Sequence, residues 1–217
     1  MSKKRDAGSI KLIGGALCLD FVNTVDCYGS KDQGEYFNSC QDLIDWSRHV
    51  GTITTAEAKI MSRLAGAHPT AAKSVHSRAI ELRKTLYRIL TLTLQGRSHD
   101  RKDLAIFNNY LSTAMKRSRI VKTEKGFSWD MAGNKAELDW ILNPIVRSAA
   151  DLLISEELGR IKKCADPTCG WLFLDISRNR SRRWCDMRDC GNRAKASRYY
   201  KKRKPSRSRT VPAGKKP

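Results

Sequence analysis

Apolar residues recur at helical spacing over most of the first 159 residues of the chain. Between residues 70 and 95 they step by four and three positions, which predicts one long amphipathic helix. A further helix is expected over residues 100–116. The same period returns at Leu138, and there we expect Pro144 to kink or restart the helix. The apolar positions of the two patterned faces are Val75, Ala79, Leu82, Leu86 and Ile89, and then Leu138, Ile141, Ile145, Ala149 and Leu152.

Two shorter helices carry start signals in their sequences. Asp42 can cap a helix that runs to Val50. Thr54 is followed three residues later by Glu57, which is the spacing of a capping box. We expect the helix that follows this box to end before Pro69, since proline restricts the residue in front of it.

Two stretches depart from the helical period. Residues 118–130 alternate around Gly126, as a β-hairpin would. The apolar run GGALCLDFVNTVD, at residues 14–26, is consistent with either a buried strand or the start of a helix. The patterns together predict one mainly α domain with a small β-sheet or hairpin, an α+β fold, which ends near residue 159.

Charge divides the chain unevenly. The 217 residues include 42 Lys and Arg against 22 Asp and Glu, a net charge of +20, and residues 160–217 alone carry a net +15. A field this positive requires an anionic partner: nucleic acid, an anionic membrane surface or an acidic protein. Membrane is the weakest of the three, because no apolar run approaches the ~20 residues of a spanning helix. The amino terminus has no hydrophobic region of the signal-peptide type, so a cytoplasmic location is expected.

Four of the seven cysteines lie in this basic quarter, at Cys164, Cys169, Cys185 and Cys190. In a reducing compartment such a group indicates a metal site rather than disulfides. The spacing is Cys-x4-Cys, fifteen residues and Cys-x4-Cys, which allows two pairs of thiolates to surround one structural zinc ion. An iron–sulfur cluster and four unconnected buried thiols are the alternatives. The segment has few aliphatic residues, so zinc is expected to supply its folding free energy, and loss of a ligand to unfold it while sparing the helices.

The residues around the cysteines suggest a compact, basic module. We expect a short hairpin beside the metal, with Trp171, Phe173 and Ile176 packed and residues 178–183 exposed. A basic helix capped by Asn192 is expected after the last ligand, and such a helix can enter a DNA major groove. The candidate nucleic-acid contacts are Arg180, Arg182, Arg183, Arg193, Lys195, Arg198 and Lys202.

Motifs at both ends of the chain resemble a known family. CGNRAKASR, beginning at Cys190, together with LFLD and RRWC before it, is similar to the CGNR-type zinc finger of bacterial proteins. GGALCLDFVNT resembles the start of the ABATE domain that precedes this finger in a family of stress-induced transcription regulators. The resemblance implies a zinc finger that binds DNA and is held by the four cysteines named above.

The expected organisation has three parts. An ABATE-like, mostly helical domain covers residues 1–159, the zinc finger with its basic helix covers 160–204, and a basic tail over 205–217 is expected to be disordered. The leading hypothesis is a zinc-dependent DNA-binding protein, a bacterial transcription regulator that binds duplex DNA and whose first domain forms a homodimer, senses a ligand, or both. One alternative is an RNA- or ribosome-associated zinc protein, in which Tyr199 and Tyr200 either stack on bases or only pack. Another is a ligand or redox sensor that acts through the first domain.

The first domain offers few signals for chemistry. Asp20 and Asn23 are polar residues inside an apolar run, which indicates either a pocket for a small-molecule ligand or bonds to the backbone. The three cysteines of this domain are either redox-active, as in a sensor, or ordinary core residues. Its four His residues lie outside any metal or nucleophile motif, so an enzyme is not expected.

Overall fold

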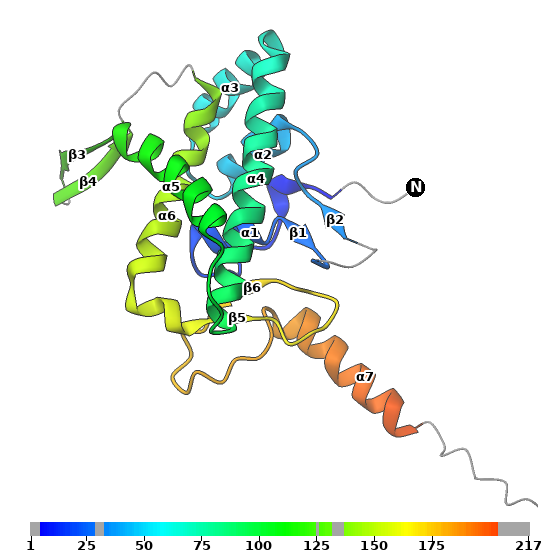
Figure 1. Ribbon diagram of the computed structural model, residues 1–217. Helices are drawn as coiled ribbons and strands as arrows, with labels where there is room; N and C mark the ends of the chain where they lie inside the picture. Colours follow the sequence, from blue (N-terminus) through cyan, green and yellow to red (C-terminus); the bar gives the residue numbers. More distant parts are fainter. Residues whose placement is uncertain (1–4, 29–32, 125, 132–136, 204–217) are drawn as a thin grey trace, which may run out of the picture.

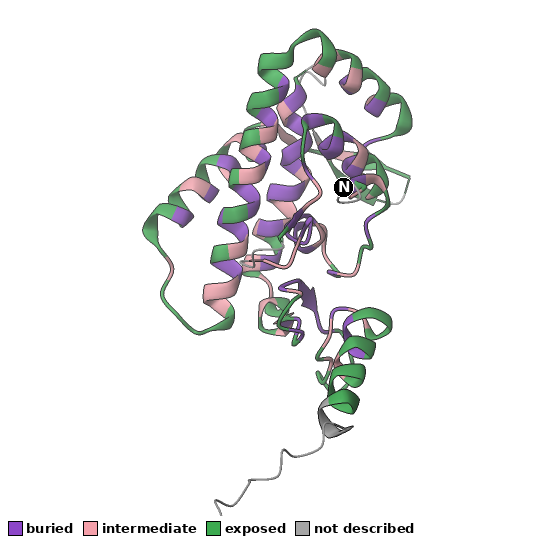
Figure 2. Ribbon diagram, turned by 90° about the vertical axis from the view of Figure 1, so that its right-hand side faces the viewer, coloured by how far each residue is buried: buried purple, intermediate pink, exposed green. Residues whose placement is uncertain are grey.

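The computed structural model describes residues 5–28, 33–124, 126–131 and 137–203. Its longest helix, α4 (Pro69–Leu94), runs through the centre of the molecule (Figure 1). Helix α5 (Arg101–Lys116) packs against both α4 and α6 (Asn143–Ile154). All the apolar positions predicted for the two patterned faces are buried. Figure 2 shows that the buried residues follow the inner sides of these helices.

The apolar run near the amino terminus forms a helix rather than a strand. Helix α1 (Leu17–Val22) follows the short 3₁₀ turn η1 (Ala7–Ser9) and contacts α4, α6 and β6 (Leu172–Leu174). A helix of this length is marginal in water, so its stability comes from packing on several sides. The rings of Phe21, Phe37 and Trp46 lie 5.6–5.9 Å apart between centroids and fill the space between α1 and the next helix.

Helix α2 (Cys40–His49) begins at a different cap from the predicted one. Ser39 is the N-cap, and its hydroxyl accepts a hydrogen bond of 3.3 Å from the N–H of Asp42. The Asp42 carboxylate accepts in turn from the N–H of Asn38 at 2.9 Å. The prediction that Asp42 caps the helix is therefore wrong. Asp42 lies at the third helical position, and its carboxylate stabilises the same helix end by accepting from the backbone in front of the cap.

Helix α3 (Thr55–Ala67) begins with the predicted capping box. The Thr54 hydroxyl accepts from the N–H of Glu57 at 3.2 Å, and the Glu57 carboxylate accepts from the N–H of Thr54 at 2.8 Å. Thr54→Ala removes one half of the box and should lower the free energy of unfolding by about 1 kcal/mol. Urea denaturation of the zinc-loaded protein measures this loss. Thr55→Ala is the matched control and should change the value by about 0.5 kcal/mol or less, and equal effects of the two changes would contradict the capping role.

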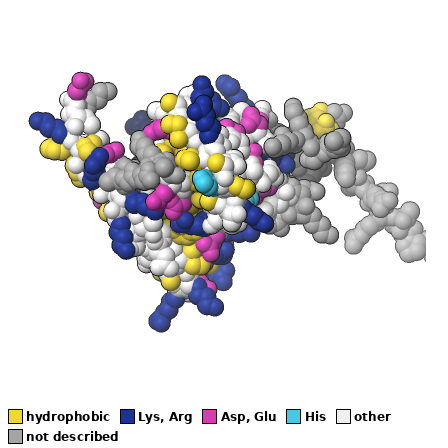
Figure 3. Space-filling model, turned by 90° about the horizontal axis from the view of Figure 1, so that it is seen from above, with side chains coloured by type: hydrophobic (Ala, Val, Ile, Leu, Met, Phe, Trp, Pro, Cys, Tyr) yellow, Lys and Arg dark blue, Asp and Glu magenta, His cyan; other side chains and the backbone are white. Residues whose placement is uncertain are grey.

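The alternating segment forms the predicted β-hairpin. Strands β3 (Ser118–Thr123) and β4 (Gly126–Met131) pair antiparallel, with Ile120 opposite Trp129. The hairpin projects from the helices in Figure 1, and hydrophobic side chains remain visible on it at the left of Figure 3. Elsewhere on the face drawn in Figure 3, Lys and Arg side chains are scattered among acidic and hydrophobic ones.

Pro144 restarts the helix rather than kinking it. The 3₁₀ turn η2 (Leu138–Leu142) ends directly before α6, and Pro144 occupies the first turn of α6. This is a position where proline loses no intrahelical hydrogen bond. A third 3₁₀ turn, η3 (Glu156–Arg160), follows α6.

The cysteine-rich quarter packs directly against the helices. Strand β5 (Ile161–Lys163) pairs antiparallel with β6, with Ile161 opposite Leu174, and a third small pair joins β1 (Val25–Asp26) to β2 (Gly34–Glu35). Leu172 and Phe173 are fully buried in the core that also holds α1. The molecule is thus mainly α with small antiparallel sheets and a terminal four-cysteine module, and its core crosses the predicted boundary at residue 159. The predicted tail over 205–217 lies outside the described residues.

Within the part of the chain that the structure describes, no helix is long and apolar enough to cross a membrane.

Candidate metal centre and basic surface

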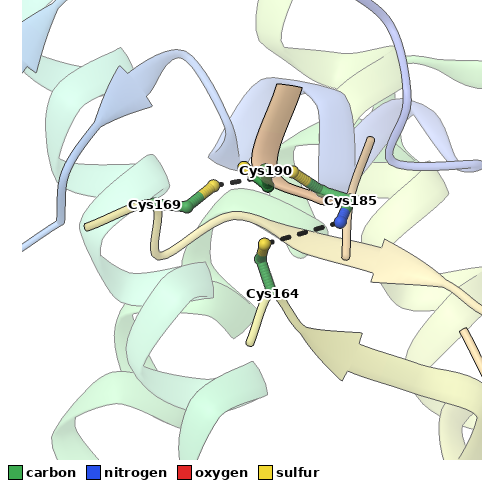
Figure 4. A group of neighbouring side chains, drawn as sticks. All are labelled: Cys164, Cys169, Cys185 and Cys190. Atoms are coloured by element: carbon green, nitrogen blue, oxygen red, sulfur yellow. Dashed lines mark hydrogen bonds between the residues drawn. The ribbon is translucent and has the colours of Figure 1, made fainter. Parts of the chain in front are cut away.

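Four cysteine side chains converge beside the β5–β6 pair. Cys164 follows β5, Cys169 precedes β6, and Cys185 and Cys190 flank the turn that leads into helix α7 (Asn192–Arg203). Their sulfur atoms all lie within 4.8 Å of one another, and the four side chains point toward a common centre (Figure 4). The two Cys-x4-Cys pairs, which are separated by fifteen residues in sequence, therefore meet in one cluster.

A buried carboxylate shapes the turn of the first pair. Asp166 accepts from the backbone N–H of Thr168 at 2.9 Å and from its hydroxyl at 2.7 Å. The Asp166 carbonyl accepts from the N–H of Cys169 at 3.0 Å. Gly170 follows with a φ of +79°, in the left-handed region that glycine enters without strain. The four residues between Cys164 and Cys169 are thus folded by an Asx-type turn.

The second pair involves a π-helical turn, η4 (Met187–Gly191): Cys185 lies just before this turn and Cys190 lies within it. The Asp186 carboxylate accepts from the N–H of Arg188 at 2.7 Å and caps this turn. Asn192 donates from Nδ2 to the carbonyl of Arg188 at 2.9 Å. The prediction of Asn192 as the helix cap is therefore wrong, because the helical conformation begins one turn earlier. A Cβ added at the buried Gly191 would lie 2.8 Å from the sulfur of Met187, whose exposed side chain would have to move.

Thiols this close together cannot all ionise without a cation. Hydrogen bonds from Cys169 and Cys185 hold the pKa of the Cys164 thiol far below its ordinary value. The same contacts raise the pKa of Cys169 and of Cys185, and burial raises the pKa of Cys190. A divalent ion among the sulfurs would remove this conflict, because a coordinated thiol is deprotonated outright. Four sulfur ligands with no open position suit one structural zinc ion.

Arg193, a predicted nucleic-acid contact, is engaged inside the module. Its Nε donates to the Asp166 carboxylate at 2.6 Å and an Nη donates to the sulfur of Cys190 at 3.1 Å. Burial alone would raise the pKa of Asp166, but hydrogen bonds from Arg193 and Thr168 outweigh it and lower the pKa. The guanidinium thus joins the two ligand turns and favours the thiolate form of Cys190.

A second buried carboxylate organises the loop between the pairs. Asp175 accepts from the N–H and the hydroxyl of Ser177 at 3.0 and 2.5 Å, from the N–H of Arg182 at 3.0 Å and from Lys162 at 2.7 Å. Arg182 donates to the carbonyl of Cys185. Sequence reasoning missed both aspartates, although each begins an Asp-x-Ser or Asp-x-Thr triplet that is typical of Asx turns.

The packing predicted for this loop is correct for two of three residues. Trp171 and Phe173 are buried, whereas Ile176 is 73% exposed and its predicted packing is wrong. The physical reason is the preceding residue, since the hydrogen bonds of Asp175 turn the chain outward before Ile176. The hairpin was predicted to lie wholly between the two cysteine pairs. In the described residues β6 pairs instead with β5, which comes before the first cysteine.

The remaining predicted contacts lie on the surface. Arg180, Arg183, Lys195 and Arg198 are exposed, while Lys202 lies in α7 but its side chain is outside the described residues. Helix α7 extends away from the body of the molecule in Figure 1, and most of its described residues are exposed in Figure 2. Lys195 and Arg198 form no ion pair with a described carboxylate, so their charge faces solvent.

The two polar residues of the predicted ligand pocket both bond to the backbone. Asp20 accepts from the N–H of Gly14 at 2.7 Å, and burial raises the pKa of its carboxyl. Asn23 is 2% exposed and bonds to the backbone of Leu172. A cavity of about 1020 Å³ does lie beside the cysteine cluster, between the amino-terminal segment, β1 and the zinc turns, but neither Asp20 nor Asn23 lines it. The geometry of both residues matches the backbone alternative, and a ligand role stays a prediction.

Comparison with known proteins gives two family matches in chain order. The ABATE family, described as "Putative stress-induced transcription regulator", matches residues 15–156, and the CGNR zinc finger matches residues 160–203. A search of curated proteins found no match.

Proposed function

Because the chain belongs to the ABATE family of transcription regulators and carries a CGNR zinc finger, we propose that it regulates transcription as a zinc-dependent DNA-binding protein. In this proposal Cys164, Cys169, Cys185 and Cys190 hold one structural zinc ion. The zinc supplies folding free energy to the module and takes no part in chemistry. The two family descriptions refer to regulation and to a zinc finger. We therefore propose that the protein acts by binding rather than by catalysis, and that it does so in the cytoplasm.

The observation that carries the proposal is the position of helix α7. This helix starts two residues after the last cysteine of the cluster, and no acidic residue occurs between Cys190 and Arg203. The helix has twelve residues and extends about 18 Å, and its diameter of about 10–12 Å fits the ~12 Å width of a major groove. An exposed helix that carries basic and no acidic side chains, anchored at a metal centre, is the arrangement that zinc-finger proteins use to enter DNA.

The residues of α7 divide between two roles. Arg193 is engaged by Asp166 and Cys190, so we propose that it supports the module rather than reads bases. Lys195, Arg198 and Lys202 follow one another at spacings of three and four and share one face of the helix. We assign Arg198 to base reading, since its guanidinium can bond a guanine in two places, and the two lysines to phosphates. Arg180, Arg182 and Arg183 lie in the neighbouring loop and would also contact phosphates. Arg182 would do so only with the part of its guanidinium that faces outward.

A second candidate function is the binding of single-stranded nucleic acid or RNA. It is favoured by Tyr199 and Tyr200, which are 55% and 69% exposed and form an edge-to-face pair with ring centroids 5.8 Å apart. Exposed aromatic rings beside basic residues can stack on unpaired bases. A homodimer and a small-molecule ligand of the first domain also remain predictions.

The test is a selection of bound fragments from a random duplex DNA pool at physiological salt, with zinc-loaded protein. Enrichment of a sequence motif supports the proposal, and a palindromic motif would indicate a dimer. Competition with single-stranded DNA and RNA of the selected sequence then separates the two candidates. Stronger competition by the single strands than by the duplex would contradict duplex recognition.

A further inference from the structure

A segment of the first domain lies along the turn of the first cysteine pair and bonds to strand β6. The two bonded residues, Asn23 and Leu172, are 149 positions apart in sequence. Asn23 donates from Nδ2 to the carbonyl of Leu172 at 2.8 Å, and its Oδ1 accepts from the N–H of Leu172 at 2.9 Å. This side chain thus pairs with both polar groups of one backbone residue, as a neighbouring strand would. All of these groups are buried, so water cannot replace either bond.

Three further contacts continue in the same direction. The indole N–H of Trp171 donates to the carbonyl of Val25 at 2.8 Å, and the backbone N–H of Cys27 donates to the carbonyl of Cys169 at 3.1 Å. Tyr28 packs on Gly170 so closely that a Cβ on this glycine would lie 2.8 Å from the Cβ of Tyr28. We call residues 23–28 and 169–172, which these contacts join, the seam.

The seam reaches both ligands of the first pair. Cys169 is itself a member, and its carbonyl is held by the first domain. The N–H of Cys164 donates to the carbonyl of Trp171 at 2.8 Å, so the position of Cys164 also depends on the same four residues. Two of the four sulfur atoms are therefore placed by a backbone segment whose other side is bonded to the first domain.

We propose that Asn23 is a positioning residue for the zinc centre: through Leu172 it fixes the segment that carries Cys169 and orders Cys164. The first domain then completes the metal site rather than only preceding it. The inference rests on the proposed zinc ligands, and it is independent of what the basic helix binds.

The expected loss of metal affinity follows from the role of residues that position metal ligands without binding the metal themselves. Residues that orient metal ligands typically change metal affinity about 10-fold to 100-fold when they are mutated. Asn23→Ala removes both bonds and leaves the N–H and the carbonyl of Leu172 buried without their partner, which loosens the segment next to Cys169.

The experiment uses the full-length protein, stripped of metal under reducing conditions and titrated with Co²⁺ as a spectroscopic substitute for zinc. We expect Asn23→Ala to bind Co²⁺ about 10-fold to 100-fold more weakly than the wild type and with altered visible absorption bands. Asn143→Ala is the matched control. Asn143 is another buried asparagine of the first domain, and its Nδ2 has no hydrogen-bond partner among the described residues. This control should keep the wild-type affinity and absorption bands.

Trp171→Phe provides a milder second test that keeps an aromatic side chain, removes the hydrogen bond to Val25 and gives up part of the buried indole. We expect a smaller loss of Co²⁺ affinity in the same direction. The inference is overturned if Asn23→Ala shows wild-type affinity and bands, or if Asn143→Ala changes both to the same degree. Cys185→Ser tests the ligand assignment separately from the role of Asn23. If this variant still binds one metal ion normally, the ligand assignment itself fails.

Discussion

Cys185→Ser should reduce bound zinc from one ion per chain to nearly none. A hydroxyl is a poor replacement for a thiolate, and the remaining three sulfurs would leave an open position in a site built for four. Structural zinc contributes about 10–16 kcal/mol of apparent binding free energy in small modules at neutral pH, so its loss is comparable to the whole stability of an ordinary domain. Metal content by elemental analysis of the purified variant checks the first part of this expectation.

The structure extends the consequence of this change beyond the last quarter of the chain. The sequence alone led us to expect that the helices would be spared, but Leu172 and Phe173 share one buried core with α1. Loosening β6 would expose the inner side of α1 and break the bonds between Asn23 and Leu172. We therefore expect a lower melting temperature for the helical signal in circular dichroism as well.

Cys40→Ala is the control for this prediction. Cys40 is a buried cysteine of the first domain outside the cluster, and burial raises the pKa of its thiol to about 11. The Cys40→Ala variant should keep one zinc ion per chain, although loss of the buried sulfur lowers its free energy of unfolding. A Cys185→Ser protein with full zinc content would contradict the ligand assignment, and one with no zinc but an unchanged melting temperature would contradict the shared core.

The sequence predicted what depends on neighbouring residues. The capping box at Thr54 and Glu57, the long α4 and the hairpin around Gly126 all follow from local spacing, and all are present. The cysteine cluster was also predictable, because the chemistry of thiolates leaves few ways to use four of them in a short basic segment.

Contacts between distant segments were not predictable in the same way. Asn23 was identified as unusual because it is polar within an apolar run, but nothing in the sequence connects it to Leu172. Arg193 resembled any other arginine of a basic helix until its bonds to Asp166 and Cys190 were visible. The misplaced cap at Asn192 has a related cause, since a π-helical turn that contains a metal ligand has no periodic signal of its own.

Charge reversal on helix α7 should abolish most nucleic-acid binding without disturbing the zinc centre. Lys195 and Arg198 are exposed and pair with no described carboxylate, so Lys195→Glu with Arg198→Glu removes two favourable charges and adds two repulsive ones. Each lost phosphate contact should reduce the slope of log affinity against log salt by about 1. If Arg198 reads a base, its loss alone costs about 1–3 kcal/mol, so we expect affinity to fall by at least about 100-fold at low salt.

A control must separate a specific surface from total charge. Lys59→Glu with Lys73→Glu changes the net charge by the same amount on helices α3 and α4, where both lysines are exposed. Fluorescence anisotropy with a labelled duplex, over a series of salt concentrations, compares the two double variants with the wild type. If α7 is the binding surface, only the α7 variant loses affinity and salt dependence. If both variants weaken equally, binding reflects the overall positive field, and if neither weakens, the nucleic acid lies elsewhere.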